Sequence, residues 1–401
     1  MQAPRAQRRR DGYVDSGALK RTWSIAAGLG DDVPLYFYSH LFAHHPELRE
    51  MFPVAMGAQR DKLFAALGHI ISHVDRIDDV GEFVRQLGRD HRRFSVIPEH
   101  YSMVGSSFLA TLQRFVGAEW TDAVAKDWAQ AYGIIAKVMV IAAEDASDET
   151  PPWWEGEVTA VDRRSLDVAV LQVRLPQDFT YVPGQSVAVE VPALPRTWRY
   201  LSPANAPRPD GTVEFHVQLV PGGLFSTAAV RKTSPGDVIR VGAPVGEQLT
   251  ADGGRDLLLV AGGTGLAPLS AVLDGVAARW RQDGSGPRVD LFHGARVPWN
   301  LYDEARLADL AAREPWFSFH PVVSDDATFP GYRGWVGAAA ASHPSAAGRL
   351  ALVCGSGAMV SHTVGELVGA GVPRGDIRYE DYTGVEDNSS PTGEEQLEGT
   401  R

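Results

Sequence analysis

Residues from about 15 to 147 carry apolar side chains at intervals of three and four positions. Leu63, Leu67 and Ile70 show this spacing, and it continues through residues 101–115. A period of 3.6 residues is typical of amphipathic helices that bury one face. The pattern therefore predicts an all-helical domain over this first third of the chain.

The period changes after residues 147–152, a polar segment that contains a Pro-Pro pair. Because prolines end helices and favour extended backbone, we interpret this segment as a linker. Beyond it apolar residues alternate with polar ones, among them Glu214, His216 and Gln218. A period of two predicts half-buried strands of a small barrel or sandwich. Such strands are expected around 187–191 and 213–219, in a domain of residues 148–252.

Residues 253–384 show a third pattern, in which short apolar runs at 257–261, 289–293 and 350–354 alternate with helical stretches. This alternation favours an α/β domain with a doubly wound parallel sheet and crossover helices. The chain is thus expected to be multidomain. Its ends are expected to be a flexible basic tail, residues 1–14, and an acidic disordered tail, residues 385–401.

The composition narrows the function classes. The 401 residues carry a formal net charge of −12, which argues against nucleic-acid binding and favours small-molecule partners. Cys354 is the only cysteine, so no intrachain disulfide can form, and we interpret it as a small residue at a strand end. No run of about 18 apolar residues predicts a transmembrane segment. We expect a cytoplasmic protein and infer no obligatory protein partner.

The strongest motif is AGGTGLAPLSAV, residues 261–272, between an apolar run and a helical pattern. Gly263, Gly265 and Pro268 stand where a dinucleotide fingerprint has its three glycines. Such a turn brings backbone amides close to a pyrophosphate at the N-terminus of a helix. It predicts a nucleotide site.

Two turns of the middle domain carry further candidate chemistry. Arg199-Tyr200-Leu201-Ser202 offers a guanidinium and a hydroxyl that can grip a phosphate. Gly222-Gly223 is followed by Ser226 and Thr227, which offer amides and hydroxyls to a pyrophosphate.

These motifs, with Cys354-Gly355 and a terminal Tyr-Glu-Asp-Tyr, occur in an order that resembles the ferredoxin-reductase-like flavin module. The resemblance implies that the arginine and glycine-serine turns hold FAD and that an aromatic residue, Tyr382, covers the flavin ring. It implies that NADH or NADPH binds at the glycine-rich turn and the later Cys-Gly pair. Arg296 could meet a 2′-phosphate, so the choice between NADH and NADPH stays open. The implied FAD residues are Arg199, Tyr200, Ser202, Gly222, Gly223, Ser226 and Thr227, and the implied nicotinamide residues are Gly262, Gly263, Thr264, Gly265, Pro268, Cys354 and Gly355.

The helical third resembles the globin domain of flavohaemoglobins in its segments 48–53, Gln59-Arg60 and His91 followed by residues 97–101. The chain would then combine a globin haem domain, an FAD barrel and an NAD(P) domain. The resemblance implies haem b, with His91 as the proximal iron ligand, Phe52 against the porphyrin, and Tyr38 and Gln59 facing the distal ligand.

The chain departs from this family at several positions. The usual proximal relay of a tyrosine and a glutamate would use Tyr101 with either Glu144 or Asp145. Leu201 stands in the place of the tyrosine of the flavin turn, and Ser186 stands where a barrel aromatic is usual. We expect FAD to bind, but less firmly.

The resemblance implies a nitric oxide dioxygenase, which passes electrons from NAD(P)H through FAD to haem and converts dioxygen and nitric oxide to nitrate. Two alternatives stay open. The globin could bind or sense oxygen while the reductase keeps its iron ferrous, or the chain could be an NAD(P)H-flavin oxidoreductase without nitric oxide dioxygenase activity.

Overall fold

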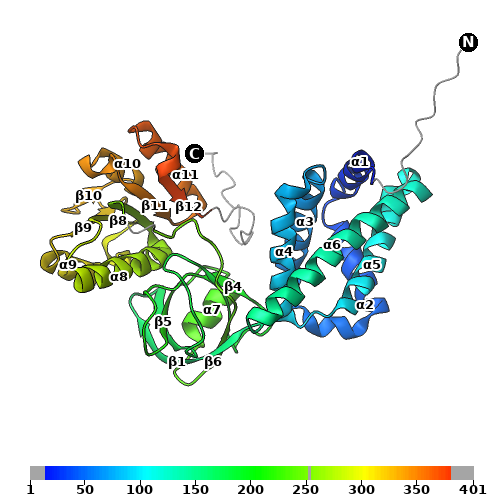
Figure 1. Ribbon diagram of the computed structural model, residues 1–401, viewed down its shortest axis with the longest axis horizontal. Helices are drawn as coiled ribbons and strands as arrows, with labels where there is room; N and C mark the ends of the chain where they lie inside the picture. Colours follow the sequence, from blue (N-terminus) through cyan, green and yellow to red (C-terminus); the bar gives the residue numbers. More distant parts are fainter. Residues whose placement is uncertain (1–13, 252–253, 381–401) are drawn as a thin grey trace, which may run out of the picture. The chain divides into compact units, whose positions relative to one another are not determined.

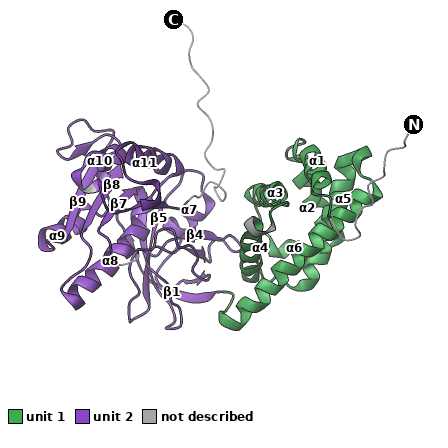
Figure 2. Cartoon of the chain, turned by 45° about the horizontal axis from the view of Figure 1, so that its top comes forward, with its two compact units in different colours: residues 1–152, 390–401 green, residues 153–389 purple. Residues whose placement is uncertain are grey.

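The computed structural model describes residues 14–251 and 254–380 and divides into two compact units, one up to Pro152 and one from Trp153 (Figure 2). The predicted tails and Tyr382 lie almost wholly outside the described residues. The division falls a few residues beyond the expected end of the helical domain at 147, because the last helix of the first unit continues to Glu149.

The first unit is helical, as its apolar spacing predicts (Figure 1). Its core surrounds Leu19, Leu41, Leu112 and Trp128, and the buried Trp128 indole donates a hydrogen bond to the Thr22 hydroxyl at 2.9 Å. The helices are α1 (Ser16–Ala27), α2 (Asp32–His44), α3 (Gly57–Ser72), α4 (Ile77–His91), α5 (Pro98–Val116) and α6 (Asp122–Glu149).

Helices α4 and α6 approach each other closely at Gly88. A Cβ atom built on Gly88 would lie 2.3 Å from the carbonyl oxygen of Met139, a separation that real atoms do not show. On the same helix, a Cβ on Gly81 meets only the guanidinium of Arg85, at 3.4 Å. Gly88 therefore fixes the position of α4 against α6, while Gly81 does not.

The second unit begins with a six-stranded antiparallel sheet in the order β4-β3-β6-β1-β2-β5. A bridge between Pro203 and Phe215 links its two ends, so the sheet nearly closes into the barrel that the resemblance implies. The strands are β1 (Trp154–Arg163), β2 (Val168–Arg174), β3 (Val187–Glu190), β4 (Arg199–Leu201), β5 (Thr212–Gln218) and β6 (Val238–Val241), with helix α7 (Leu224–Arg231) beside them.

Two barrel strands are more buried than their alternation predicts. All four residues of β3 are buried, including Glu190, whose carboxylate pairs with Arg240 at 3.2 Å. His216 of β5 is also buried, although the pattern places it on the solvent side. The expectation of half-buried strands was wrong at these positions because period two does not distinguish solvent from a second packed layer.

A second, parallel sheet follows in the order β10-β9-β8-β7-β11-β12, with α8 and α9 on one face and α10 and α11 on the other (Figure 1). This is the doubly wound fold that the alternating runs predict. Its strands are β7 (Leu257–Gly262), β8 (Val289–Ala295), β9 (Phe317–Val323), β10 (Tyr332–Arg333), β11 (Leu350–Cys354) and β12 (Ile377–Tyr379), and its helices are α8 (Leu266–Asp283), α9 (Glu304–Arg313), α10 (Val336–Ser342) and α11 (Gly357–Gly369).

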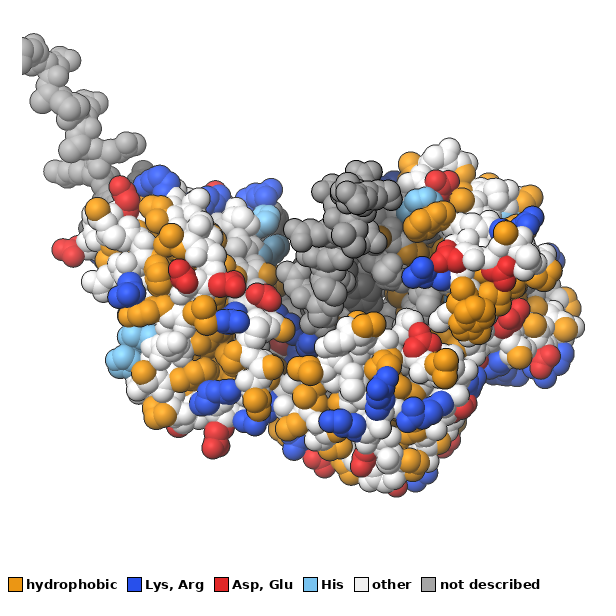
Figure 3. Space-filling view, turned by 180° about the vertical axis from the view of Figure 1, so that it is seen from behind, with side chains coloured by type: hydrophobic (Ala, Val, Ile, Leu, Met, Phe, Trp, Pro, Cys, Tyr) orange, Lys and Arg blue, Asp and Glu red, His pale blue; other side chains and the backbone are white. Residues whose placement is uncertain are grey.

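Helix hydropathy and surface charge bear on the expected location and partners of the protein. Within residues 14–251 and 254–380, every helix is too short or too polar to cross a membrane. On the face shown in Figure 3, acidic and basic side chains are interspersed over both units. The expected cytoplasmic location and the expected lack of nucleic-acid binding stay predictions.

Candidate functional site

His91, the predicted iron ligand, is the last residue of α4. Its Nδ1 lies 2.6 Å from the backbone carbonyl oxygen of Leu87. Because a carbonyl oxygen can only accept, Nδ1 carries the hydrogen and Nε2 keeps its lone pair. Burial lowers the pKa of His91, so the ring is neutral near pH 7. A neutral imidazole oriented by a backbone carbonyl is a typical proximal haem ligand.

Tyr101 of α5 lies beside His91, with 6.3 Å between the ring centroids. Burial raises the pKa of Tyr101 to about 12, which keeps the phenol protonated. The Tyr132 hydroxyl donates to the backbone carbonyl of Tyr101 at 2.6 Å and so ties α5 to α6. The structure thus brings the predicted relay tyrosine to the predicted ligand.

The predicted relay carboxylates lie elsewhere. Glu144 and Asp145 are both exposed near the end of α6, and neither hydrogen-bonds to Tyr101 or His91 within the described chain. Their role stays a prediction. Asp90, which directly precedes His91, pairs with Arg93 and accepts a hydrogen bond from Gln86 at 3.1 Å.

The distal candidates Tyr38, Gln59 and Phe52 do come together. The side-chain Nε2 of Gln59 donates to the Tyr38 hydroxyl at 3.4 Å. The same hydroxyl donates to the backbone carbonyl oxygen of Gln59, also at 3.4 Å. The rings of Phe52 and Phe42 lie 5.5 and 5.8 Å from that of Tyr38. Burial raises the pKa of Tyr38 to about 12, so its hydroxyl remains a donor. Since hydrogen bonds of 3.4 Å are weak, this hydroxyl can turn to a stronger acceptor.

The arginine turn of the barrel forms β4, which pairs with β3 so that Arg199 faces Val189. Beyond this pairing the hydroxyls of Ser202 and Ser186 lie 3.0 Å apart, and Ser186 donates to the Glu380 carboxylate at 3.4 Å. This chain of polar groups lies where FAD is expected. Sequence reasoning missed Glu380, although it is part of the Tyr-Glu-Asp-Tyr motif.

The glycine-serine turn leads into α7. Gly222 has a φ of +77°, a conformation that favours glycine. The Ser226 hydroxyl accepts from the Val220 amide at 3.0 Å and donates to the Gly223 carbonyl at 3.3 Å. Ser226 therefore shapes the turn, and the first amides of α7, which no side chain caps, are left for a pyrophosphate.

The glycine-rich turn joins β7 to α8 through one turn of 3-10 helix, Gly263–Gly265, and Pro268 is buried in the first turn of α8. A Cβ on Gly265 would lie 2.3 Å from the Cys354 carbonyl oxygen, and one on Gly355 would lie 2.9 Å from Met359 Sδ. These glycines let the turns after the adjacent parallel strands β7 and β11 pack against each other. The predicted residues thus meet at the carboxyl edge of the sheet, where nucleotides bind in this fold.

Two buried histidines lie beneath this turn and were not predicted. His293 Nε2 donates to the Gly263 carbonyl at 3.1 Å, and its Nδ1 is buried without a hydrogen-bond partner among residues 14–251 and 254–380. His216 Nδ1 bonds to the Tyr302 hydroxyl at 2.9 Å, and the Tyr302 ring packs against His293. Burial lowers the pKa of each histidine to about 4. A neutral network thus connects barrel strand β5 to the glycine-rich turn.

Comparisons with known proteins support the order of the three domains. The globin family matches residues 35–139, the oxidoreductase FAD-binding domain matches 155–249, and the oxidoreductase NAD-binding domain matches 259–365. A flavohemoprotein of Vibrio cholerae is 24% identical over 385 residues, covering 90% of this chain and 95% of the relative. One of Halalkalibacterium halodurans is 28% identical, covering 65% and 69%.

Other similarities concern the reductase part or the fold. The reductase component DmpP of a Pseudomonas phenol 2-monooxygenase is 30% identical, covering 61% of this chain and 69% of that protein. The crystal structure of a Malassezia yamatoensis flavohemoglobin with bound FAD and heme has a TM-score of 0.68 and 17% identity, covering 91% of this chain and 97% of that one. The last comparison shows that the order of folds is shared along nearly the whole chain.

Proposed function

Because this chain belongs to the flavohaemoproteins, by its order of globin, FAD-binding and NAD-binding domains, we propose that it is a nitric oxide dioxygenase. Its cofactors are haem, FAD and a nicotinamide nucleotide, and electrons pass from NAD(P)H through FAD to haem. The proposed part is the final reaction, in which each nitric oxide takes up one dioxygen and one electron to give nitrate.

The observation that carries the proposal is the distal group of Tyr38, Gln59 and Phe52. A buried phenol that stays protonated can donate to an oxygen atom that gains negative charge, and this interaction is strongest where water is excluded. The rings of Phe42 and Phe52 contact each other and both pack against the Tyr38 ring, which is buried. The weak contacts of the phenol with Gln59 leave it able to reorient towards a ligand.

The other residues hold and orient the cofactors. His91 would hold the iron through Nε2, and the Leu87 carbonyl fixes the plane of its ring. Arg199 and the amides after Gly223 would hold the phosphates of FAD, while the Ser186, Ser202 and Glu380 chain can keep a proton at the flavin site. When bound, the cofactors supply hydride transfer, single-electron transfer and oxygen activation.

Stopped-flow mixing tests the proposal. The haem- and FAD-loaded protein, reduced with NADH in air, is mixed with nitric oxide, and both nitric oxide loss and nitrate formation are followed. We expect fast loss that depends on NADH, and we expect His91→Ala to abolish it while NADH oxidation by an artificial acceptor such as ferricyanide continues. Nitric oxide loss no faster than in buffer would refute the proposal.

One observation favours the alternative of an oxygen-binding or sensing globin. Glu144 and Asp145 are exposed, so neither places a carboxylate against Tyr101 or His91. Such a relay would increase electron donation by His91. Reversible oxygen binding without nitric oxide turnover would support this alternative, whereas NADH oxidation insensitive to His91→Ala, without either property, would support a flavin oxidoreductase.

A further inference from the structure

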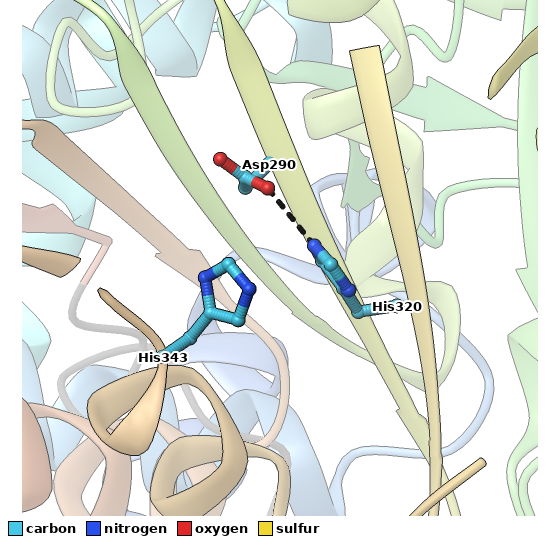
Figure 4. Close-up of side chains that lie close together, drawn as sticks. All are labelled: Asp290, His320 and His343. Carbon is cyan, nitrogen blue, oxygen red and sulfur yellow. Dashed lines mark hydrogen bonds and ion pairs between the residues drawn. The ribbon is translucent and has the colours of Figure 1, made fainter. Parts of the chain in front are cut away.

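Asp290, His320 and His343 form a group of potential metal ligands in the parallel-sheet domain (Figure 4). Asp290 and His320 lie on the neighbouring strands β8 and β9 and point towards each other, while His343 faces them from the end of α10. One ligand atom from each residue lies within 4.8 Å of the other two. Three separate segments of the domain, two strands and the end of a helix, thus place three donors around one point.

The carboxylate of Asp290 is buried and held on both oxygens. His320 Nε2 lies 2.9 Å from Oδ1, and Arg349 Nη1 lies 2.7 Å from Oδ2. Both carboxylate oxygens are therefore oriented by donors from other segments.

Aromatic rings fix the histidines further. Phe292 stacks on His320 with 4.4 Å between centroids, and it meets His343 edge-on at 5.5 Å. The two imidazoles lie 4.7 Å apart by centroid. The donor atoms of the three residues therefore lie near enough to one another to surround one ion.

We propose that these three residues bind a divalent transition-metal ion of the zinc class, with water as a fourth ligand. Two imidazoles and one carboxylate are ligands that zinc prefers, and three protein ligands with an open position are a common set. The ion replaces the hydrogen between Asp290 and His320, and Arg349 stays on the other carboxylate oxygen as an orienting partner. The positive guanidinium weakens binding but does not occupy the ligand oxygen.

The site is separate from the nucleotide edge. Asp290 pairs with Leu258, four residues before the pair of Gly262 and Gly294, which corresponds to roughly 13 Å along the strands. The ion would join the end of α10 to β8 and β9. Its role is to stabilise this face of the sheet, independent of electron transfer and of the proposed reaction.

Zinc binding to the haem- and FAD-loaded protein tests the proposal. Calorimetry gives the stoichiometry and affinity, and zinc K-edge absorption identifies the ligands without interference from iron or flavin. We expect one equivalent bound by two imidazoles and further oxygen ligands. His343→Gln should weaken zinc binding at least about 100-fold. Loss of a residue that only orients a ligand already costs up to about 100-fold, and loss of a direct ligand should cost at least as much. The matched control is His362→Gln, on α11 of the same domain, which should bind zinc as the unchanged protein does.

His320→Gln provides a second variant in case His343→Gln fails to fold, and circular dichroism checks both. Absence of a stoichiometric site, or a site that both ligand variants retain, would overturn the proposal. So would an absorption spectrum without imidazole ligands. If His362→Gln lost zinc binding to the same extent, the ion would lie elsewhere, and this result would also overturn the proposal.

Discussion

Acidification should destabilise the second unit through two buried histidines. His216 is 8% exposed and His293 is 0% exposed, and burial lowers the pKa of each from 6.5 to about 4. In the unfolded chain both titrate near 6.5, so between pH 6.5 and 4 the unfolded state binds more protons than the folded state. The free energy of unfolding therefore falls as the pH drops through this window.

The magnitude follows from the two pKa values. At pH 5 an imidazole with an unfolded pKa of 6.5 is mostly protonated, while the buried ring is mostly neutral. The difference corresponds to about 1.5 pH units, or about 2 kcal/mol for each histidine. The two rings share Tyr302 as a neighbour, and charge on one opposes charge on the other, so their effects need not add.

Urea unfolding of the full-length protein measures the effect. Flavin fluorescence reports the second unit because bound flavin is released when the barrel unfolds. His216→Gln and His293→Gln keep a hydrogen-bonding side chain but remove the titration. Between pH 7 and 5 the unchanged protein should lose about 2 kcal/mol more than either variant. The control His362→Gln, at a half-buried position of α11, should follow the unchanged protein.

The difference in pH dependence between the unchanged protein and each variant isolates the substituted histidine, because the other acid-sensitive groups contribute equally to both unfolding free energies. Parallel curves for the unchanged protein and the two glutamine variants would mean that the rings are hydrated or already charged in the folded state. The assignment of a neutral network beneath the glycine-rich turn would then be wrong.

Three further predictions concern the other sites. Tyr38→Phe should speed oxygen dissociation from the reduced protein roughly 10- to 100-fold, because a hydrogen bond to a partly charged oxygen atom is lost. Stopped flow measures this rate, and an unchanged rate would show that the phenol does not reach the ligand. Gly88→Ala should move α4 and weaken haem retention, measured by haem transfer to apomyoglobin, whereas Gly81→Ala should not; equal retention would remove the packing argument. Gly265→Ala should lower kcat/KM for NADH roughly 100-fold while Gly275→Ala leaves it unchanged, and a normal value for the first variant would refute the close approach at the turn.

The sequence predicted the order of folds because each domain has a different hydrophobic period. Some backbone features of the candidate haem and nucleotide residues also follow from local sequence. Gly263 has a φ of +52° in the glycine-rich turn, and His91 ends a helix with its Nδ1 on the carbonyl four residues earlier. Such features are determined within one or two turns of chain, so a motif carries them.

The contacts between distant segments could not be predicted in this way. Glu380 accepts a hydrogen bond from the Ser186 hydroxyl across 194 positions, and the sequence marked Ser186 only as a position where the family usually has an aromatic residue. The exposure of Glu144 and Asp145 could not be predicted either, because their place in the relay came from a family register counted along α6. A register counted along one helix cannot show which side chains its neighbours leave exposed.

A physical signal for the remaining polar groups was nevertheless present in the sequence. Strand β8 is buried on both faces, and its apolar run still contains Asp290 and His293. A polar side chain in such a strand costs free energy unless it finds a partner. The structure supplies Arg349 and His320 to the first and the Gly263 carbonyl to the second. A charged or imidazole residue inside the apolar run of a parallel strand therefore predicts a partner from another segment. In β8, Asp290 belongs to the proposed metal site and His293 belongs to the acid-sensitive network.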